Sequence, residues 1–303
     1  MKKYLFSTLL AAALLLAGCS KEAGTRDGVG SEEDPHTFAG YPVVYMARNI
    51  SPEGISSLLE ELEAPLSGKV AVKLSKHISE IDSVTPELID TILNSADDAV
   101  PVSGSTAYGT SILPDTDILD EESSIALTVD GGDILSETYI GNKFLEYDYL
   151  IVLSHFQLDP KIGFTGVLKD VSMGLASAEG KNWIASGGTS LTDPQCDEAT
   201  ARLYAIGEAS KAVADSLNGS ALYIGIVDDR SLQEIGGADG AVRYTVASYD
   251  PVALDMACID LITHSESGDV ARQYIDNQNG LYTLAHAEKI GLGSCTYALL
   301  DIS

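Results

Sequence analysis

The chain has 303 residues, of which 45% are hydrophobic, and its 18 Lys and Arg against 45 Asp and Glu give a formal net charge of −27. This excess of acid excludes nucleic acid as a partner, because binding to phosphate backbones depends on Lys and Arg. The hydrophobic content excludes a mainly disordered chain. Four cysteines in a chain of this length exclude a small scaffold held by disulfides.

Residues 1–18 have the composition of a secretion signal rather than of a folded element. Two lysines precede an apolar run from Leu5 to Ala17, which is too short for a stable membrane span. The Leu-Ala-Gly sequence before Cys19 resembles the signal of bacterial lipoproteins, in which the cysteine becomes the lipidated first residue. An ordinary secretory signal with an incidental cysteine is the alternative interpretation.

The lipoprotein resemblance predicts both a location and a partner. Acyl chains on Cys19 would anchor the protein to a membrane of the cell envelope. Ser20 follows the cysteine where an aspartate could stand, which by the same resemblance favours the outer membrane, facing the periplasm or the cell surface. Residues 19–40 are rich in Gly, Ser, Thr and acidic side chains without apolar periodicity, which predicts a flexible tether.

Apolar, β-rich runs recur along residues 41–303, and several are continuous, as in strands buried on both faces. The predicted strands are Pro42–Ala47, Lys69–Leu74, Ala99–Ser103, Ile125–Val129, Tyr149–Ser154, Ala221–Val227, Val242–Ala247 and Thr296–Ile302. Helix start signals lie between them. Four helices are predicted. The first runs from Thr85 to about Ala96, the second from Asp193 to about Leu217, the third starts at Asp250, and the fourth runs from Thr283 to about Gly291. The alternation predicts an α/β fold, a single large domain with a largely parallel or mixed sheet flanked by helices.

The segment from Tyr149 to Lys181 is the most informative part of the sequence. A buried-type strand is followed by four glycines and three lysines within 21 residues, from Lys161 to Lys181. Glycine lets a backbone approach a ligand closely, and N–H groups together with lysine form a cradle for anions. Ligands of α/β sheets bind beyond the carboxyl ends of strands, so the segment predicts a site for a small anionic ligand. Glycines that serve tight turns, with solvated lysines, are the alternative.

The same segment resembles the domain of unknown function 362 family, whose members are often described as uncharacterised iron–sulfur centre proteins. The matching positions are Ser154-His155-Phe156, Gly163-Phe164, Gly166, Leu168-Lys169, Met173-Gly174, Ser177 and Gly180-Lys181. Residues 104–109, 248–255 and 290–297 are similar to three further family segments, so the resemblance covers about residues 69–303. Gln157, Asp159 and Asp170 depart from the family, which has Lys, His and Asn at these places.

Ten candidate ligand-binding residues follow from the motif and the resemblance. They are His155, Gly163, Gly166, Lys169, Ser177, Gly180, Lys181, Asp250, Asp255 and Tyr108. His155 ends a strand, where site groups emerge, although a histidine paired with a backbone carbonyl is the alternative. Asp250 is also a good helix N-cap, and Asp255, one turn further, could face the same pocket. Asp228 and Asp229 could hold a metal with His155, but a solvated loop is the simpler interpretation, and no metal site is predicted.

Cysteine spacing bears on the iron–sulfur chemistry that the resemblance implies. Many family members carry a ferredoxin-like insert with CxxCxxC spacing, whereas only Cys196 lies in the corresponding interval here. With Cys19 lipidated, Cys196, Cys258 and Cys295 remain, and a [4Fe–4S] cluster needs about four close thiolates. No cofactor is therefore predicted. Cys258 is either a small buried hydrophobe on its helix or the partner of Cys295 in a disulfide.

The expected function is the binding of a small anionic ligand or metal by an envelope-anchored lipoprotein. No reaction is predicted, because the sequence contains neither an acid–base pair of known spacing nor a G-x-S-x-G motif. One alternative is an Fe–S or redox-associated protein, as in family relatives. The other is a non-catalytic envelope interaction protein, for which the departures at Gln157, Asp159 and Asp170 could mark a decayed site.

Overall fold

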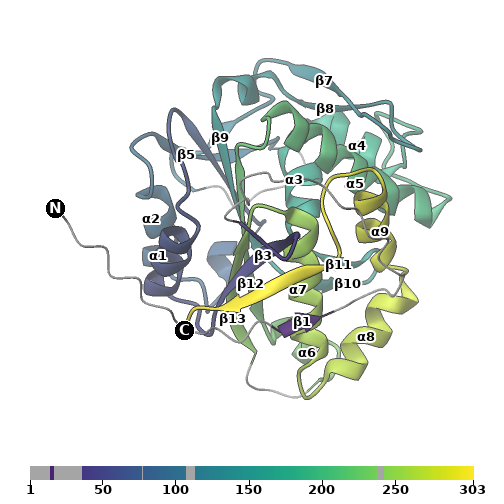
Figure 1. The fold of residues 1–303 in the computed structure, drawn as a ribbon. Coiled ribbons are helices and arrows are strands. Elements are labelled where there is room, and N and C mark those ends of the chain that lie inside the picture. Colours follow the sequence, from purple (N-terminus) through teal and green to yellow (C-terminus); the bar gives the residue numbers. More distant parts are fainter. Residues whose placement is uncertain (1–13, 17–35, 77, 107–112, 238–241) are drawn as a thin grey trace, which may run out of the picture.

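A mixed sheet with helices on both faces forms the centre of the molecule (Figure 1). The predicted α/β class with a mixed, largely parallel sheet is therefore confirmed. Cys19 and Tyr108 lie outside the described residues. The computed structural model describes residues 14–16, 36–76, 78–106, 113–237 and 242–303.

The elements alternate along the chain as an α/β fold requires. The strands are β1 (Leu14–Leu16), β2 (Thr37–Phe38), β3 (Tyr41–Ala47), β4 (Val70–Leu74), β5 (Ala99–Ser103), β6 (Asp117–Ile118), β7 (Ser124–Thr128), β8 (Glu137–Gly141), β9 (Tyr149–His155), β10 (Gln157–Asp159), β11 (Gly163–Thr165), β12 (Ala221–Asp228), β13 (Arg243–Ser248) and β14 (Tyr297–Asp301). The α-helices are α1 (Pro52–Glu61), α2 (Pro86–Leu93), α3 (Val167–Leu175), α4 (Ala178–Ala185), α5 (Ala199–Ser216), α6 (Arg230–Glu234), α7 (Pro251–Thr263), α8 (Gly268–Asn277) and α9 (Leu281–Lys289). Two short 3-10 helices are η1 (Ile78–Glu80) and η2 (Asn142–Glu146).

The main sheet has the strand order β1-β14-β3-β13-β12-β9-β4-β5-β6, with β2 paired to β3. Strands β12, β9, β4, β5 and β6 are parallel neighbours, whereas β13 runs antiparallel to both β12 and β3. Strand β3 therefore has the same direction as β12. We call the edge where β4, β5, β9 and β12 end the carboxyl edge, and the edge where they begin the amino edge.

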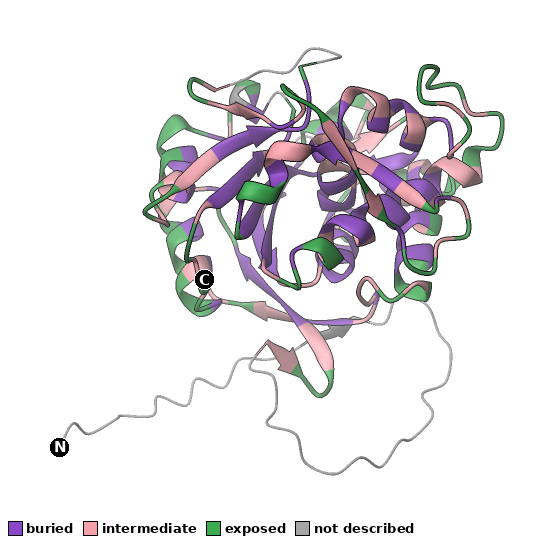
Figure 2. Cartoon of the chain, turned by 90° about the horizontal axis from the view of Figure 1, so that it is seen from above, coloured by how far each residue is buried: buried purple, intermediate pink, exposed green. Residues whose placement is uncertain are grey.

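Each face of the sheet buries its own hydrophobic core, because successive strand residues point to opposite faces. Ile151 and Leu153 of β9 pack with α1 and α2, whereas Leu150 and Val152 pack with α3, α5 and α7. Figure 2 shows the buried residues along the central strands and the exposed ones on the outer helix surfaces. The two faces thus present different side chains at the carboxyl edge, which matters for the site.

All eight predicted strands form, each within one residue of its expected ends. The helix predictions at Thr85 and Asp250 are also confirmed. Helix α5 begins six residues after Asp193, because the Asp193 carboxylate accepts the Gln195 N–H at 3.0 Å in a turn instead of capping a helix. Thr283 is likewise no cap, since it lies inside α9. Helices α1, α3, α4, α6 and α8 had no prediction.

Two findings concern the cysteines and the membrane. Cys258 is buried on α7 and Cys295 is buried in the loop before β14, and neither forms a disulfide. The interpretation of Cys258 as a small buried hydrophobe is confirmed, and none of the described cysteines forms a disulfide. Within the described ranges, no helix combines the length and the apolar character needed to cross a membrane.

Candidate functional site

Polar side chains gather at the carboxyl edge, where three parallel strands end side by side. In register, Leu74 lies opposite Leu153 and Ile226 lies opposite His155, so the ends of β4, β9 and β12 are level with one another. We call the polar residues at and around these ends the strand-end cluster. Its members are Lys73, Ser75, Ser154, His155, Asp170, Lys181 and Asp228.

Asp170 of α3 is the centre of the cluster on the α3 face of the sheet. Its carboxylate accepts hydrogen bonds from the hydroxyl groups of Ser75 and Ser154, the latter at 2.7 Å. The Ser75 hydroxyl oxygen also accepts the backbone N–H of His155 at 3.0 Å. Ser75 therefore connects the α3 face with the residue that ends β9.

His155 and Asp228 form a buried pair on the opposite face. His155 Nε2 and Asp228 Oδ1 lie 3.0 Å apart, with His155 3% exposed and Asp228 6% exposed. The Gln157 amide nitrogen lies 2.9 Å from His155 Nδ1, so both ring nitrogens have a polar neighbour within hydrogen-bond distance. The interpretation of Asp228 as part of a solvated loop is wrong, as is that of His155 as paired with a backbone carbonyl.

The surroundings of Asp228 favour its ionised form. Burial by itself opposes the charge, but hydrogen bonds from His155 and from the Ser83 hydroxyl, the latter at 2.9 Å, hold the pKa of Asp228 below its usual range. Among the described residues, no group of histidine, cysteine and acidic side chains has the arrangement of a metal site. The pair is thus an oriented imidazole and carboxylate.

Two lysines complete the cluster beside the end of α3. Lys73 is 6% exposed and its ammonium donates to the Leu74 carbonyl, while the partly buried Lys181 donates to the Ala176 carbonyl at 2.6 Å. Burial lowers the pKa of Lys73, and Asp170 offsets part of this effect. Burial and the charge of Lys73 together lower the pKa of Lys181 to about 8. In the described part of the chain, neither ammonium forms an ion pair with a carboxylate.

The N-terminus of α3, where the glycine motif predicted an anion cradle, holds a carboxylate of the protein itself. Asp255 of α7 accepts the N–H groups of Val167 at 2.7 Å and Leu168 at 3.0 Å. Asp255 is fully buried, and burial raises its pKa to about 7. A Cβ on Gly166 would lie 2.2 Å from Asp255 Oδ1, so this glycine lets the helix end approach the carboxylate.

Three other motif residues serve local structure. Ser177 caps α4 by accepting the Gly180 N–H at 3.1 Å, and a Cβ on Gly180 would lie 2.1 Å from the Tyr139 carbonyl oxygen. Gly163 has a φ of +86°, which glycine adopts without strain. The alternative in which the glycines serve turns and close packing therefore describes these positions.

The structure does not bring all the candidates together. Lys169 of α3 pairs at 3.5 Å with Asp159 of the antiparallel β10–β11 hairpin, and its side chain takes part in none of the hydrogen bonds or ion pairs of the cluster described above. Asp250 lies at the amino edge, where Oδ1 caps α7 and Oδ2 accepts the Ser294 N–H at 2.9 Å. Of the ten candidates, His155 and Lys181 belong to the strand-end cluster.

Five cluster members are not among the ten candidates: Lys73, Ser75, Ser154, Asp170 and Asp228. Lys73 could have been selected from the sequence, because a lysine near the end of a continuous apolar strand is unusual. A Cβ on Gly174 would lie 2.3 Å from Lys73 Cε, so a glycine of the motif makes room for a lysine 101 residues earlier. Nothing in the local sequence shows this pairing.

The fold and the cluster define an α/β protein with a polar site at the carboxyl edge of its sheet. Residues 50–260 match the family described as Domain of unknown function (DUF362), and the chain belongs to that family. The resemblance drawn from the motifs is confirmed, although the C-terminal segment 290–297 lies beyond the matched range. No functionally curated protein matches the sequence.

Two solved structures have folds similar to this one. One is the lactate racemase apoprotein from Thermoanaerobacterium thermosaccharolyticum, at 13% identity and a TM-score of 0.44. The other is a Thermotoga maritima protein solved by the Northeast Structural Genomics Consortium, at 14% identity and a TM-score of 0.42. Each alignment covers 76% of this chain but only 58% and 59% of the respective neighbour, so this chain spans less than two thirds of either.

Proposed function

We propose that this protein is an envelope lipoprotein, anchored at Cys19, which binds a small anionic ligand at the strand-end cluster. Lys73 and Lys181 would hold the anion on the α3 face of the sheet, with Ser154 beside them as a further hydrogen-bonding group. The observation that carries the proposal is the pair of neighbouring ammonium groups that have no carboxylate partner among the described residues.

The energetics of the two lysines support an anionic ligand. Each ammonium has three N–H donors, of which the described contacts occupy one. Burial of the two charges is unfavourable, the charges of Asp170 and Asp120 offset only part of it, and the two like charges repel one another. A carboxylate or phosphate placed between them would accept the remaining donors and raise the pKa of both lysines. Lys181 as a residue is only partly buried.

A structural role for the lysines is the competing explanation. Ala176 follows the last residue of α3, so Lys181 donates to a carbonyl at the helix C-terminus, where a positive charge is favourable. A capping role alone predicts that replacing Lys181 lowers stability without any effect on anion binding. The two explanations therefore separate in a binding experiment.

Isothermal titration calorimetry with inorganic phosphate and with malonate tests the proposal. We expect saturable binding of at least one anion, a loss of about tenfold or more in affinity for Lys73→Met and for Lys181→Met, and weaker binding above the pKa of Lys181, about 8. Lys169→Met is the matched control, because Lys169 pairs with Asp159 instead. Absence of binding by either anion, or equal affinity in the wild type and both cluster variants, would refute the proposal.

The anchor is tested separately by metabolic labelling with palmitate and by membrane fractionation. We expect the wild type to carry the label and to sediment with membranes, and the Cys19→Ala variant to do neither. An unlabelled wild type would refute the lipoprotein part while leaving the binding part intact.

The expectation that no iron–sulfur cluster is bound also stays a prediction. Anaerobic purification, iron analysis and a visible spectrum test it, and we expect a colourless protein without iron. Stoichiometric iron would favour the redox alternative instead.

A further inference from the structure

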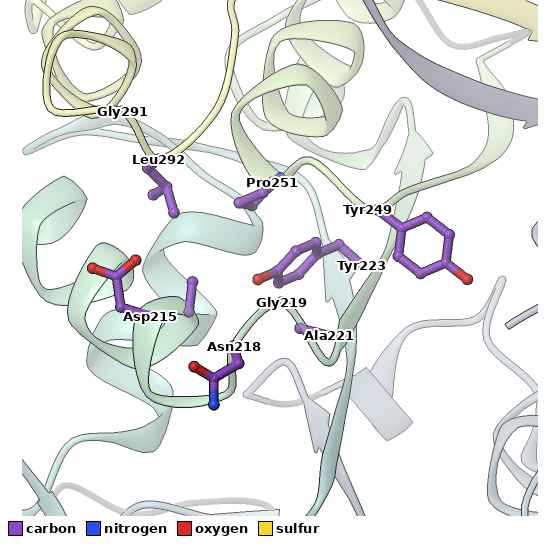
Figure 3. Close-up of a pocket in the computed structure, with 10 residues that line it drawn as sticks. Asp215, Asn218, Gly219, Ala221, Tyr223, Tyr249, Pro251, Gly291 and Leu292 are labelled. Atoms are coloured by element: carbon purple, nitrogen blue, oxygen red, sulfur yellow. The ribbon is translucent and has the colours of Figure 1, made fainter. Parts of the chain in front are cut away.

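A pocket of about 360 Å³ opens at the amino edge of the sheet, the edge opposite the strand-end cluster, and Figure 3 shows residues that line it. It lies where α5 and α9 end and where β12 and α7 begin. Its volume falls in the lower range for small-molecule sites. The pocket is lined by Ala214, Asp215, Asn218, Gly219, Ala221, Tyr223, Tyr249, Pro251, Gly291 and Leu292.

Tyr223 is the feature that indicates a ligand. Its side chain extends into the pocket, with the hydroxyl group toward the space between Asp215 and Pro251 (Figure 3). The residue as a whole is only 2% exposed, while its hydroxyl, which forms no hydrogen bond within the described part of the chain, reaches the open space of the pocket. A ligand in the pocket could therefore bond to this hydroxyl without displacing a partner within the protein. Burial, with the charge of Asp250, raises the pKa of Tyr223, so the hydroxyl remains neutral.

The electrostatic surroundings select a positively charged ligand. Asp215 lies on the wall of the pocket and uses one oxygen, Oδ2, to pair with Lys211 at 2.5 Å. Helices α5 and α9 both end at the pocket with their partial negative charge, whereas the N-terminus of α7, which also lies there, is capped by the Asp250 carboxylate. The lining contains no lysine or arginine, and it includes two tyrosine rings, whose faces attract cations.

We propose that this pocket binds a small organic ammonium group. The ammonium would donate one hydrogen bond to the Tyr223 hydroxyl oxygen and face the Asp215 carboxylate, while Pro251 and Leu292 would contact its carbon chain. The site is independent of the proposed anion site. Tyr223 and Asp228 are five residues apart on β12, which places the two sites roughly 16 Å apart along the strand.

The ammonium group could belong to a free amine or to a phospholipid headgroup. Both share the chemistry that the pocket recognises. The described segment that leads into β2 and β3 begins at His36, whose ring lies tilted against Tyr249 with 4.4 Å between the centroids, so this segment lies beside the pocket. A lipid anchor at the N-terminal side would therefore bring this edge, rather than the other, toward a membrane.

Saturation-transfer NMR with n-butylammonium, and with uncharged n-butanol as the isosteric control, tests the proposal. We expect the ammonium to bind saturably at millimolar concentrations and more tightly than the alcohol. Tyr223→Phe removes only the hydroxyl and should weaken binding by about three- to tenfold. Ala214→Phe fills the pocket and should abolish binding, whereas Tyr282→Phe, on an exposed residue of α9, should change nothing.

A second arm distinguishes the two sources. The Cys19→Ala protein is mixed with phosphatidylcholine vesicles with and without phosphatidylethanolamine, and retention that requires the ethanolamine lipid and disappears in Tyr223→Phe identifies a headgroup. Binding of n-butylammonium without vesicle retention identifies a free amine. No saturation by n-butylammonium, equal binding of n-butanol, or binding that survives Ala214→Phe would overturn the proposal.

Discussion

Asp255→Asn gives the sharpest test of how the start of α3 is held. The Asp255 carboxylate is fully buried and accepts two N–H groups of the first turn of α3. An asparagine has the same shape without the charge, and its amide oxygen can still accept one of the two N–H groups. The substitution therefore exchanges one hydrogen bond for relief from burying a charge.

The pH dependence follows from the pKa of Asp255, which burial raises from 3.8 to about 7. Between these values the folded state keeps a proton that the unfolded state has lost, so this group lowers the free energy of unfolding as the pH rises. A shift of about three units corresponds to about 4 kcal/mol, an upper value for the whole window. The Asn variant should match the wild type near pH 4 and exceed it in stability at pH 8, by up to about 4 kcal/mol.

Urea unfolding followed by circular dichroism at several pH values between 4 and 8 measures this difference. Subtracting the wild-type curve cancels the contributions of all other titrating groups. Asp90→Asn, on the exposed side of α2, is the matched control and should show a constant difference. A difference between Asp255→Asn and the wild type that stays flat with pH would refute the reasoning that burial governs this carboxylate.

Three further predictions concern stability and are read from urea unfolding. Gly166→Ala should lower the free energy of unfolding by about 2 kcal/mol, because the added methyl group meets Asp255 Oδ1; an unchanged midpoint would contradict the close approach. Glu208→Gln should lower the free energy of unfolding by about 3 kcal/mol, because the fully buried carboxylate accepts the Leu135 N–H at 2.6 Å and contacts His286 Nε2 at 2.7 Å. A loss of less than about 1 kcal/mol would contradict this prediction. The Asp228→Asn variant should be less stable than the wild type at pH 7. The difference in the free energy of unfolding should shrink as the pH falls below about 4, because Asp228 has a lowered pKa in the folded state and its stabilising effect is lost as it is protonated. A difference that does not change with pH would refute this prediction.

The strands of the sheet were predictable because each has a signal in its own local sequence. Continuous apolar runs such as Tyr149–Ser154 can be buried on both faces only in the middle of a sheet covered by helices, and β9 takes that place. Helix starts were predictable where a cap and a proline coincide, as at Asp250-Pro251. Asp193-Pro194 has the same local signal and fails, because Asp193 forms a turn six residues before α5 begins.

The site was predictable only in part because its contacts join distant parts of the chain. His155 could be selected from its position at a strand end, but Asp228, its partner, lies 73 residues further along. The glycines gave a misleading signal for a physical reason. The same close backbone approach that admits a ligand also admits a carboxylate of the protein, and at Gly166 the neighbour is Asp255. Sequence alone does not distinguish these two uses of glycine.

The direction of β3 has a consequence for how the two edges of the sheet would face their surroundings. Because β3 runs parallel to β12, Tyr41 lies at the amino edge and Ala47 lies toward the carboxyl edge. In a protein anchored by lipid at its N-terminus, the amino edge would then be the edge nearest the bilayer. The strand-end cluster would point outward into the aqueous compartment, where water-soluble anions diffuse freely. If the proposed lipid anchor is present, the direction of β3 therefore makes the amino edge the side closer to the membrane, while anionic headgroups would repel the strongly acidic body.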